Sequence, residues 1–395
     1  MKKLLESIGP GIITAALVFG PGSLTVNTKL GSNFGYALIW VIVISIFLMI
    51  SFTRLSARIG LREQASLMEM IRRRYGQIWA VIIGIGIFLI TSSFQAGNSI
   101  GAGIAFAELF AMSATPWIIF FSLGAISLLF FKSFYRILEK IMIGLVIIML
   151  VSFFLTLLLS GPSLKALFSG FIPSIPSGSE LLTIALVASS FSIVGAFYQA
   201  YLVQEKGWTV NDERRASIES RNGIIILGLL SAMVMMCAAS VLHGNEIDVK
   251  SASDLGLALE PLLGKSTTIV FMIGFFAASF SSLIGNATIG GTILADAFGM
   301  GRRLRSWPVR SMIILVIVMG STIAILFGRL PLELIVFAQA ITIVIAPAAA
   351  TFLLLLDKFG REKTVNEYVR SNPIPILGLL VLLSLAVYNV NKLLL

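Results

Sequence analysis

The sequence is poor in charge and poorer still in the residues that build catalytic or metal sites. Of its 395 residues only 12% are charged, one is a cysteine and one is a histidine. Cys237 alone cannot form an intramolecular disulfide, and His243 alone cannot form a histidine-rich metal site. There is no His-Glu-x-x-His motif and no central pair of aspartates, so acid–base and metal-water chemistry have no evident residues. We therefore expect no enzyme activity, no bound metal and no cofactor.

Apolar residues dominate instead: they make up 57% of the chain, and the mean hydropathy is +0.98. A soluble core cannot absorb so much apolar surface, and too few charges remain to cover the outside. The composition predicts an all-α protein that spans the lipid bilayer many times, and it excludes soluble enzymes and secreted modules. Eleven stretches approach the roughly 20 apolar residues that a membrane helix needs. They lie near 9–28, 36–55, 78–109, 116–132, 137–159, 181–204, 222–242, 267–296, 309–327, 331–355 and 373–391.

The surplus of basic residues follows this topology. The chain has 29 Lys and Arg against 19 Asp and Glu. If the N-terminus is cytoplasmic, 23 of the 29 fall in inner connections and six in outer ones. The positive-inside rule accounts for this asymmetry, so no nucleic-acid partner is needed. We expect a multi-pass protein of the plasma (inner) membrane with its N-terminus cytoplasmic and its C-terminus outside.

Two of the predicted spans carry an interruption near their centres. Span 1 contains Gly20-Pro21-Gly22-Ser23. Span 6 has a centre rich in small and polar residues, 189–196, and Ser192–Ala196 is the part expected to match the break in span 1. Proline removes a backbone donor and glycine tolerates unwound dihedrals, so both helices are expected to break at membrane depth. A simple kink is the other interpretation. Interrupted helices at matching places in two halves are typical of the substrate site of a secondary transporter.

The two expected breaks occupy corresponding positions in two halves of the chain, and this predicts how the single transmembrane domain, 1–395, is organised. The first inverted repeat would span 1–160 and the second 179–356, and an extra C-terminal helix would follow at 371–395.

Acidic residues are absent from the predicted membrane centre, where a carboxylate costs roughly 2.5–3.5 kcal/mol and is normally kept for function. The candidates Glu108, Glu180, Glu205, Asp296 and Glu333 all fall near span ends. The polar residues left at depth are neutral: Gln95, Asn98, Ser192, Gln199, Asn286 and Gln339.

Several motifs together resemble the Nramp divalent-metal transporters. They are Gly9-Pro10-Gly11 and Gly20-Pro21-Gly22-Ser23 in span 1, Gly31-Ser32-Asn33-Phe34-Gly35-Tyr36, Arg54-Leu55-Ser56-Ala57-Arg58-Ile59-Gly60, Ile100-Gly101-Ala102-Gly103-Ile104-Ala105, Arg136-Ile137-Leu138-Glu139 and Phe337-Ala338-Gln339. The resemblance covers nearly the whole chain. It implies a LeuT-type fold of two inverted five-helix repeats, with helices 1 and 6 broken.

The resemblance does not extend to the family's ion-binding residues. Where the family has Asp-Pro-Gly-Asn, this chain has Gly20 and Ser23 in place of the Asp and Asn. The aligned part of span 6, Ser192–Ala196, lacks the family's Met-Pro-His type motif, and Gln95 and Asn98 replace the span 3 acids that serve proton movement. Of the family's ion-contacting side chains, the resemblance retains only Gln339, so transition-metal symport is not expected.

A small inorganic anion such as bicarbonate is the leading hypothesis for the substrate, because helix N-termini favour anions and no acid repels one. Its expected site comprises Gly20, Pro21, Gly22, Ser23, Thr25, Ser192, Ile193, Val194, Gly195, Ala196 and Gln339. The alternative is a divalent metal cation, Mg²⁺ or Mn²⁺, carried with relaxed selectivity; a non-transporting sensor is a third interpretation. Transport could be coupled to a gradient of Na⁺ or H⁺, or it could be uniport without a coupling ion.

Overall fold

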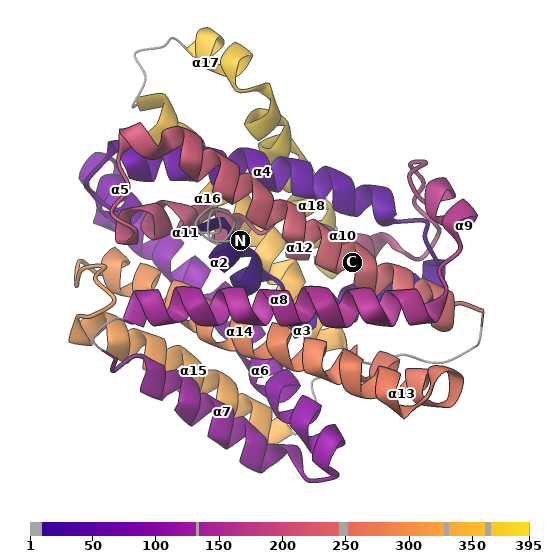
Figure 1. Cartoon of the computed structure of the whole chain (residues 1–395). Coiled ribbons are helices and arrows are strands. Elements are labelled where there is room, and N and C mark those ends of the chain that lie inside the picture. Colours follow the sequence, from indigo (N-terminus) through magenta and orange to yellow (C-terminus); the bar gives the residue numbers. More distant parts are fainter. Residues whose placement is uncertain (1–9, 132–133, 245–251, 328–331, 360–364, 395) are drawn as a thin grey trace.

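The computed structural model describes residues 10–131, 134–244, 252–327, 332–359 and 365–394 (Figure 1). Within these ranges the regular structure is helical throughout. Gly9 of the first motif lies outside the described residues. So do these basic residues counted in the connections: Lys2, Lys3, Lys132, Arg361 and Lys363 on the predicted inner side, and Lys250 and Arg329 on the outer side.

Nine helices or unbent helix pairs of the described part are long and apolar enough to cross a membrane, and the bent pair α2–α3 forms a tenth. Their bounds are α2 Pro10–Val18 with α3 Pro21–Phe34, α4 Ile39–Arg62, α6 Gln77–Phe110, α8 Phe134–Ser160, α10 Glu180–Ser190 with α11 Ile193–Glu205, α12 Glu213–Val241, α14 Lys265–Ala297, α15 Trp307–Phe327, α16 Leu332–Phe359 and α18 Pro373–Leu394. The expected span at 116–132 is α7, Ala114–Leu128, whose 15 residues are shorter than a typical membrane helix. Among the described residues, the structure thus has ten candidate spans and one shorter apolar helix at the place of the remaining expected span.

Short helices occupy connections that the hydropathy pattern left unassigned. They are α5 Leu67–Tyr75, α9 Leu164–Ser169, the 3₁₀ turn η1 Val210–Asp212, α13 Ala252–Leu263 and α17 Val365–Ser371. In Figure 1, α9 and α13 lie at one end of the bundle and α5 lies at the other. This separation agrees with the predicted sides of the membrane, because α9 and α13 fall in predicted outer connections and α5 in an inner one.

Two facing glycines bring the N-terminal helix against α12. A Cβ added to Gly223 would lie 1.9 Å from the backbone oxygen of Gly11, and one added to Gly11 would lie 1.9 Å from the backbone oxygen of Glu219. Small residues permit such close approach between membrane helices. The contact holds α2 in the middle of the bundle and so positions the break that follows it.

The four candidate acids whose side chains are described lie within three residues of a helix end, as the sequence predicts: Glu108 in α6, Glu180 in α10, Glu205 in α11 and Asp296 in α14. Asp296, one residue before the end of α14, is buried and accepts a hydrogen bond of 2.7 Å from the Tyr201 hydroxyl. On the connection beyond α16, burial and then the neighbouring Asp357 carboxylate raise the pKa of Tyr368, so its hydroxyl stays protonated and donates to Asp357 over 2.9 Å. The side chain of Glu333 lies outside the described residues.

Candidate functional site

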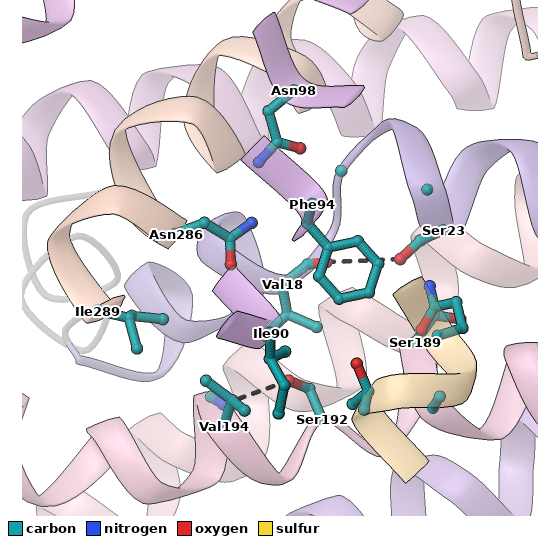
Figure 2. Close-up of a pocket in the computed structure, with 16 residues that line it drawn as sticks. Val18, Ser23, Ile90, Phe94, Asn98, Ser189, Ser192, Val194, Asn286 and Ile289 are labelled. Atoms are coloured by element: carbon teal, nitrogen blue, oxygen red, sulfur yellow. Dashed lines mark hydrogen bonds between the residues drawn. The ribbon is translucent and has the colours of Figure 1, made fainter. Parts of the chain in front are cut away.

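The first break separates α2 from α3 at Phe19 and Gly20, and the two helices meet at an angle of 66°. Gly20 is extended, with φ −126° and ψ −172°, and Pro21 opens α3, where its missing N–H leaves no intrahelical hydrogen bond unmade. The Ser23 hydroxyl donates to the Val18 carbonyl at 3.4 Å (Figure 2). A Cβ on Gly20 would lie 2.7 Å from Ser282 Oγ, so a side chain has no room here.

The second break lies at Phe191 and Ser192, between α10 and α11. Ser192 caps α11: its Oγ accepts a hydrogen bond of 3.2 Å from the Gly195 N–H. The break therefore falls at the leading edge of the predicted window, and Ile193–Ala196 form the first turn of α11. A Cβ on Gly195 would lie 2.6 Å from Val18 Cγ2, so the two breaks are in contact.

A small cavity of about 40 Å³ lies where the breaks meet (Figure 2). A water molecule needs roughly 10–15 Å³ on this measure, so the space suits an inorganic ion and little else. The lining residues come from seven helices and both breaks: Val18, Gly20, Gly22, Ser23, Ile90, Phe94, Asn98, Ala188, Ser189, Ser192, Val194, Gly195, Asn286, Ile289, Gln339 and Thr342.

The structure brings together most, but not all, of the residues that the sequence singled out. Gly20, Gly22, Ser23, Ser192, Val194, Gly195 and Gln339 line the cavity, while Pro21, Thr25, Ile193 and Ala196 do not. Sequence reasoning left Ser189, Asn286 and Thr342 out of the expected site. Asn286 was visible as a polar residue at depth, and Thr342 follows Gln339 by three residues and so shares its helix face.

The two span 3 amides have different roles. Gln95 joins α6 to α14 by donating from Nε2 to the Leu283 carbonyl over 2.8 Å, and it does not line the cavity. Asn98 donates from Nδ2 to the Ser282 carbonyl over 3.2 Å. The Asn98 Oδ1 atom faces the first break, since a Cβ on Gly20 would lie 3.0 Å from it.

The cavity is neutral and rich in hydrogen-bond acceptors. None of its described lining residues is ionisable or carries sulfur. Ser189 and Thr342 give their hydroxyl hydrogens to the carbonyls of Leu186 and Ala338, at 3.0 and 2.9 Å, and so offer lone pairs to a ligand. The buried Gln339 Oε1 has no hydrogen-bond partner among the described residues.

An all-helical membrane bundle in which two interrupted helices meet at a buried central cavity is the architecture of a secondary transporter. A family model described as "Natural resistance-associated macrophage protein-like" matches residues 11–395. The chain belongs to the Nramp family, as the motifs predicted. Because this is a family of membrane transporters, membership also supports, at family level, the expectation that the chain is not an enzyme.

Similar proteins agree with this assignment. A divalent metal cation transporter MntH from Pectobacterium carotovorum is 28% identical over 86% of this chain and 82% of its own length. The MntH of Yersinia pestis is 27% identical over 97% of this chain and 93% of its own length. These names give no support to the anion hypothesis and favour its alternative.

Solved structures confirm the fold that the resemblance implied. The manganese transporter of Eremococcus coleocola superposes with a TM-score of 0.72 over 98% of this chain and 94% of its own, at 19% identity. MhsT in complex with L-phenylalanine superposes with a TM-score of 0.60 over 95% of this chain and 98% of its own, at 15% identity. The chain therefore has the LeuT-type fold.

Proposed function

We propose that this protein is a secondary transporter that moves a divalent metal cation, Mg²⁺ or Mn²⁺, by alternating access and with part of the cation's water shell retained. The names of the relatives point to such a substrate. The observation that carries the proposal is the acceptor-rich cavity, above all the buried and unpartnered Gln339 Oε1. An acceptor without a donor is satisfied by a cation or by water bound to one.

The donor set favours a hard and weakly held cation. Neutral hydroxyl and amide oxygens suit Mg²⁺, which keeps several of its waters, whereas thiolate and thioether ligands select softer metals. No carboxylate among the described lining residues neutralises the charge. We therefore expect Mg²⁺ and Mn²⁺ to compete at similar concentrations, with affinities on the order of 10⁻³ M, as in sites with few charged ligands.

A small anion such as bicarbonate is the second candidate, and one feature favours it. The first turn of α11 directs the N–H groups of Ile193 and Val194 toward the break, and the helix N-terminus carries a partial positive charge. Ser192 Oγ accepts from Gly195, so its own hydrogen is free to donate. An anion would use these donors, whereas the cation uses the oxygens on α10 and α16.

For the energy source, we propose that protons do not drive transport, because Gln95 and Asn98 cannot exchange a proton near neutral pH. A sodium gradient is the other source that the sequence suggests. Ser282 Oγ lies 3.3 Å from the carbonyl oxygens of both Ala16 and Leu17, which forms a cluster of three oxygens beside the first break. Uptake that rises with an inward sodium gradient would indicate coupling, and uptake indifferent to sodium and pH gradients would indicate uniport.

Flux measurements in proteoliposomes containing the full chain test the proposal. Saturable uptake of Mg²⁺ and Mn²⁺ is expected, with calorimetric Mg²⁺ binding that weakens in Ser23→Ala. Bicarbonate flux without any divalent-cation flux would overturn the cation proposal and establish the second candidate.

A further inference from the structure

A second cavity, of about 610 Å³, lies between the last turns of α4 and the first turns of α12. It shares no lining residue with the central cavity. Four arginines line it, Arg54, Arg58, Arg214 and Arg221, with one acidic residue, Glu213. We name this feature the arginine groove.

The positive charge of the groove is only partly balanced. Arg58 pairs with Glu213 at 3.1 Å and with the buried Asp357 of α16 at 3.6 Å. Arg54, Arg214 and Arg221 make no ion pair with any residue that the structure describes. The unmatched positive charge of these three arginines makes the groove suitable for an anionic ligand from outside the chain.

The packing of α4 against α12 sets the level of the groove's arginines along the bundle. Helices α4 and α12 run antiparallel and touch at Ile46 and Gly228, where a Cβ on Gly228 would lie 2.7 Å from Ile46 Cγ1. Arg54 is eight residues beyond Ile46, and Arg221 is seven residues before Gly228. At 1.5 Å per residue both lie about 11 Å from that contact, at one level near the end of the bundle.

Exposed apolar side chains continue from these arginines toward the middle of the bundle. On α12, Ile225 and Leu229 follow Arg221 at helical spacing and are 41% and 52% exposed. On α4, Phe47 precedes Arg54 by two turns and is 56% exposed. In a membrane-spanning helix such exposed apolar residues face lipid tails. The groove thus places cations where headgroups begin and apolar surface where acyl chains lie.

We propose that the arginine groove binds the phosphate group of an anionic phospholipid. The guanidinium fork matches phosphate oxygens, and basic pockets between membrane helices hold anionic headgroups. The ligand would sit in the cytoplasmic leaflet if the orientation predicted from the basic residues holds. Its phosphate would bridge α4 and α12 beside Arg58, which already links α12 to α16 through Glu213 and Asp357. This proposal is independent of the ion that the central cavity carries.

Native mass spectrometry of the purified full chain tests lipid binding directly. The wild type is expected to retain phosphatidylglycerol at least about tenfold better than phosphatidylcholine. Each arginine near an anionic headgroup contributes about fivefold in affinity, so the double change Arg54→Gln and Arg221→Gln should weaken binding by about 25-fold. The matched control is Arg303→Gln with Arg305→Gln, two exposed arginines between α14 and α15, and it should leave binding unchanged.

Three results would each overturn the proposal. They are equal retention of the two lipids by the wild type, equal loss in the groove and control variants, and displacement of phosphatidylglycerol by millimolar inorganic phosphate, which would identify a soluble ligand. If the groove variant fails to fold, the salt dependence of lipid binding by the wild type still tests the proposal. Selective binding that fades as salt rises from about 0.1 to 0.5 M supports the groove, and binding indifferent to salt contradicts it.

Discussion

Replacing Gly20 by alanine tests whether the central cavity depends on the close contact between the first break and α14. The added Cβ would lie 2.7 Å from Ser282 Oγ, 2.9 Å from Ser282 Cβ and 3.0 Å from Asn98 Oδ1. The backbone of Gly20 suits alanine, so the expected effect comes from space and not from backbone strain. Because Ser282 is short and buried, the break or α14 must move to relieve the contact.

The loss of stability in Gly20→Ala can be estimated from substitutions that overpack the cores of other proteins. Inserting a methyl group into a filled site costs about 1–3 kcal/mol, and we expect that loss in the free energy of unfolding of Gly20→Ala. Divalent-cation flux should fall by about tenfold or more, since the cavity wall itself moves. Ser282→Gly removes both contacting atoms of Ser282 at a cost of about 1 kcal/mol of helix propensity. The double variant should therefore lose less free energy of unfolding than the two single variants together, by about 0.5–3 kcal/mol.

Denaturant unfolding in detergent and flux in proteoliposomes measure the two effects on the same preparations. Gly124→Ala on α7 is the matched control, because its added Cβ would meet nothing within 4 Å. The reasoning fails if Gly20→Ala is as harmless as this control, or if the effects of Gly20→Ala and Ser282→Gly simply add. If it holds, the aspartate that the family has at this place cannot be restored without a smaller residue at 282.

Three further changes have distinct expected signatures. Gly223→Ala should lower the free energy of unfolding by about 1–3 kcal/mol, because its Cβ would meet the Gly11 carbonyl at 1.9 Å. Gln339→Leu should leave stability unchanged or raised, since it removes an unpartnered buried acceptor, yet reduce divalent-cation flux by about tenfold. Arg58→Met should destabilise by about 3 kcal/mol, because the Asp357 carboxylate stays buried without its guanidinium. Denaturant unfolding and flux assays check all three.

Substitutions of the same residue types elsewhere in the chain are the controls that separate these effects from general damage. Gly144→Ala, with nothing within 4 Å of its Cβ, should leave stability unchanged, and a loss equal to that of Gly223→Ala would refute the packing argument. Gln199→Leu should behave opposite to Gln339→Leu and lower the free energy of unfolding by about 1–3 kcal/mol, because it removes the two buried hydrogen bonds that Gln199 makes with Ser220 and Thr14. Arg73→Gln breaks an exposed pair and should cost less than about 0.5 kcal/mol; a cost matching Arg58→Met would contradict the role of burial.

Much of the fold could be predicted from local sequence. Hydropathy located the helices because each must satisfy its own backbone hydrogen bonds in lipid. Gly20 and Pro21 marked the first break because the preferences of these residues act on the backbone at their own positions. The α7 helix was predicted at its place but is shorter than expected, and the short helices α5 and α13 were not assigned. A count of apolar residues reveals neither where a helix ends nor how it packs.

The composition of the candidate site was only partly predictable. Ser192 and Gly195 line the cavity while Ile193 and Ala196, in the same turn, do not. A helix turns about 100° per residue, so neighbours in a predicted window face different directions, and only packing selects the inward face. For the same reason Thr25, which was expected in the site, does not line the cavity, and Thr342, which was not expected, does.

The sequence by itself determined that positions 20 and 23 bring no carboxylate to the site, because the identity of a side chain is the same in any fold. The fold decided that no other acidic residue joins the described lining. The tertiary structure decided which hydrogen-bonding capacity remains there. Ser189 and Thr342 give their hydrogens to backbone carbonyls, and Gln339 Oε1 is left without a donor among the described residues. That balance of acceptors over donors supports the proposal that the substrate is a cation. Packing likewise placed Arg54 beside Arg221, residues distant in sequence whose shared level no composition could reveal.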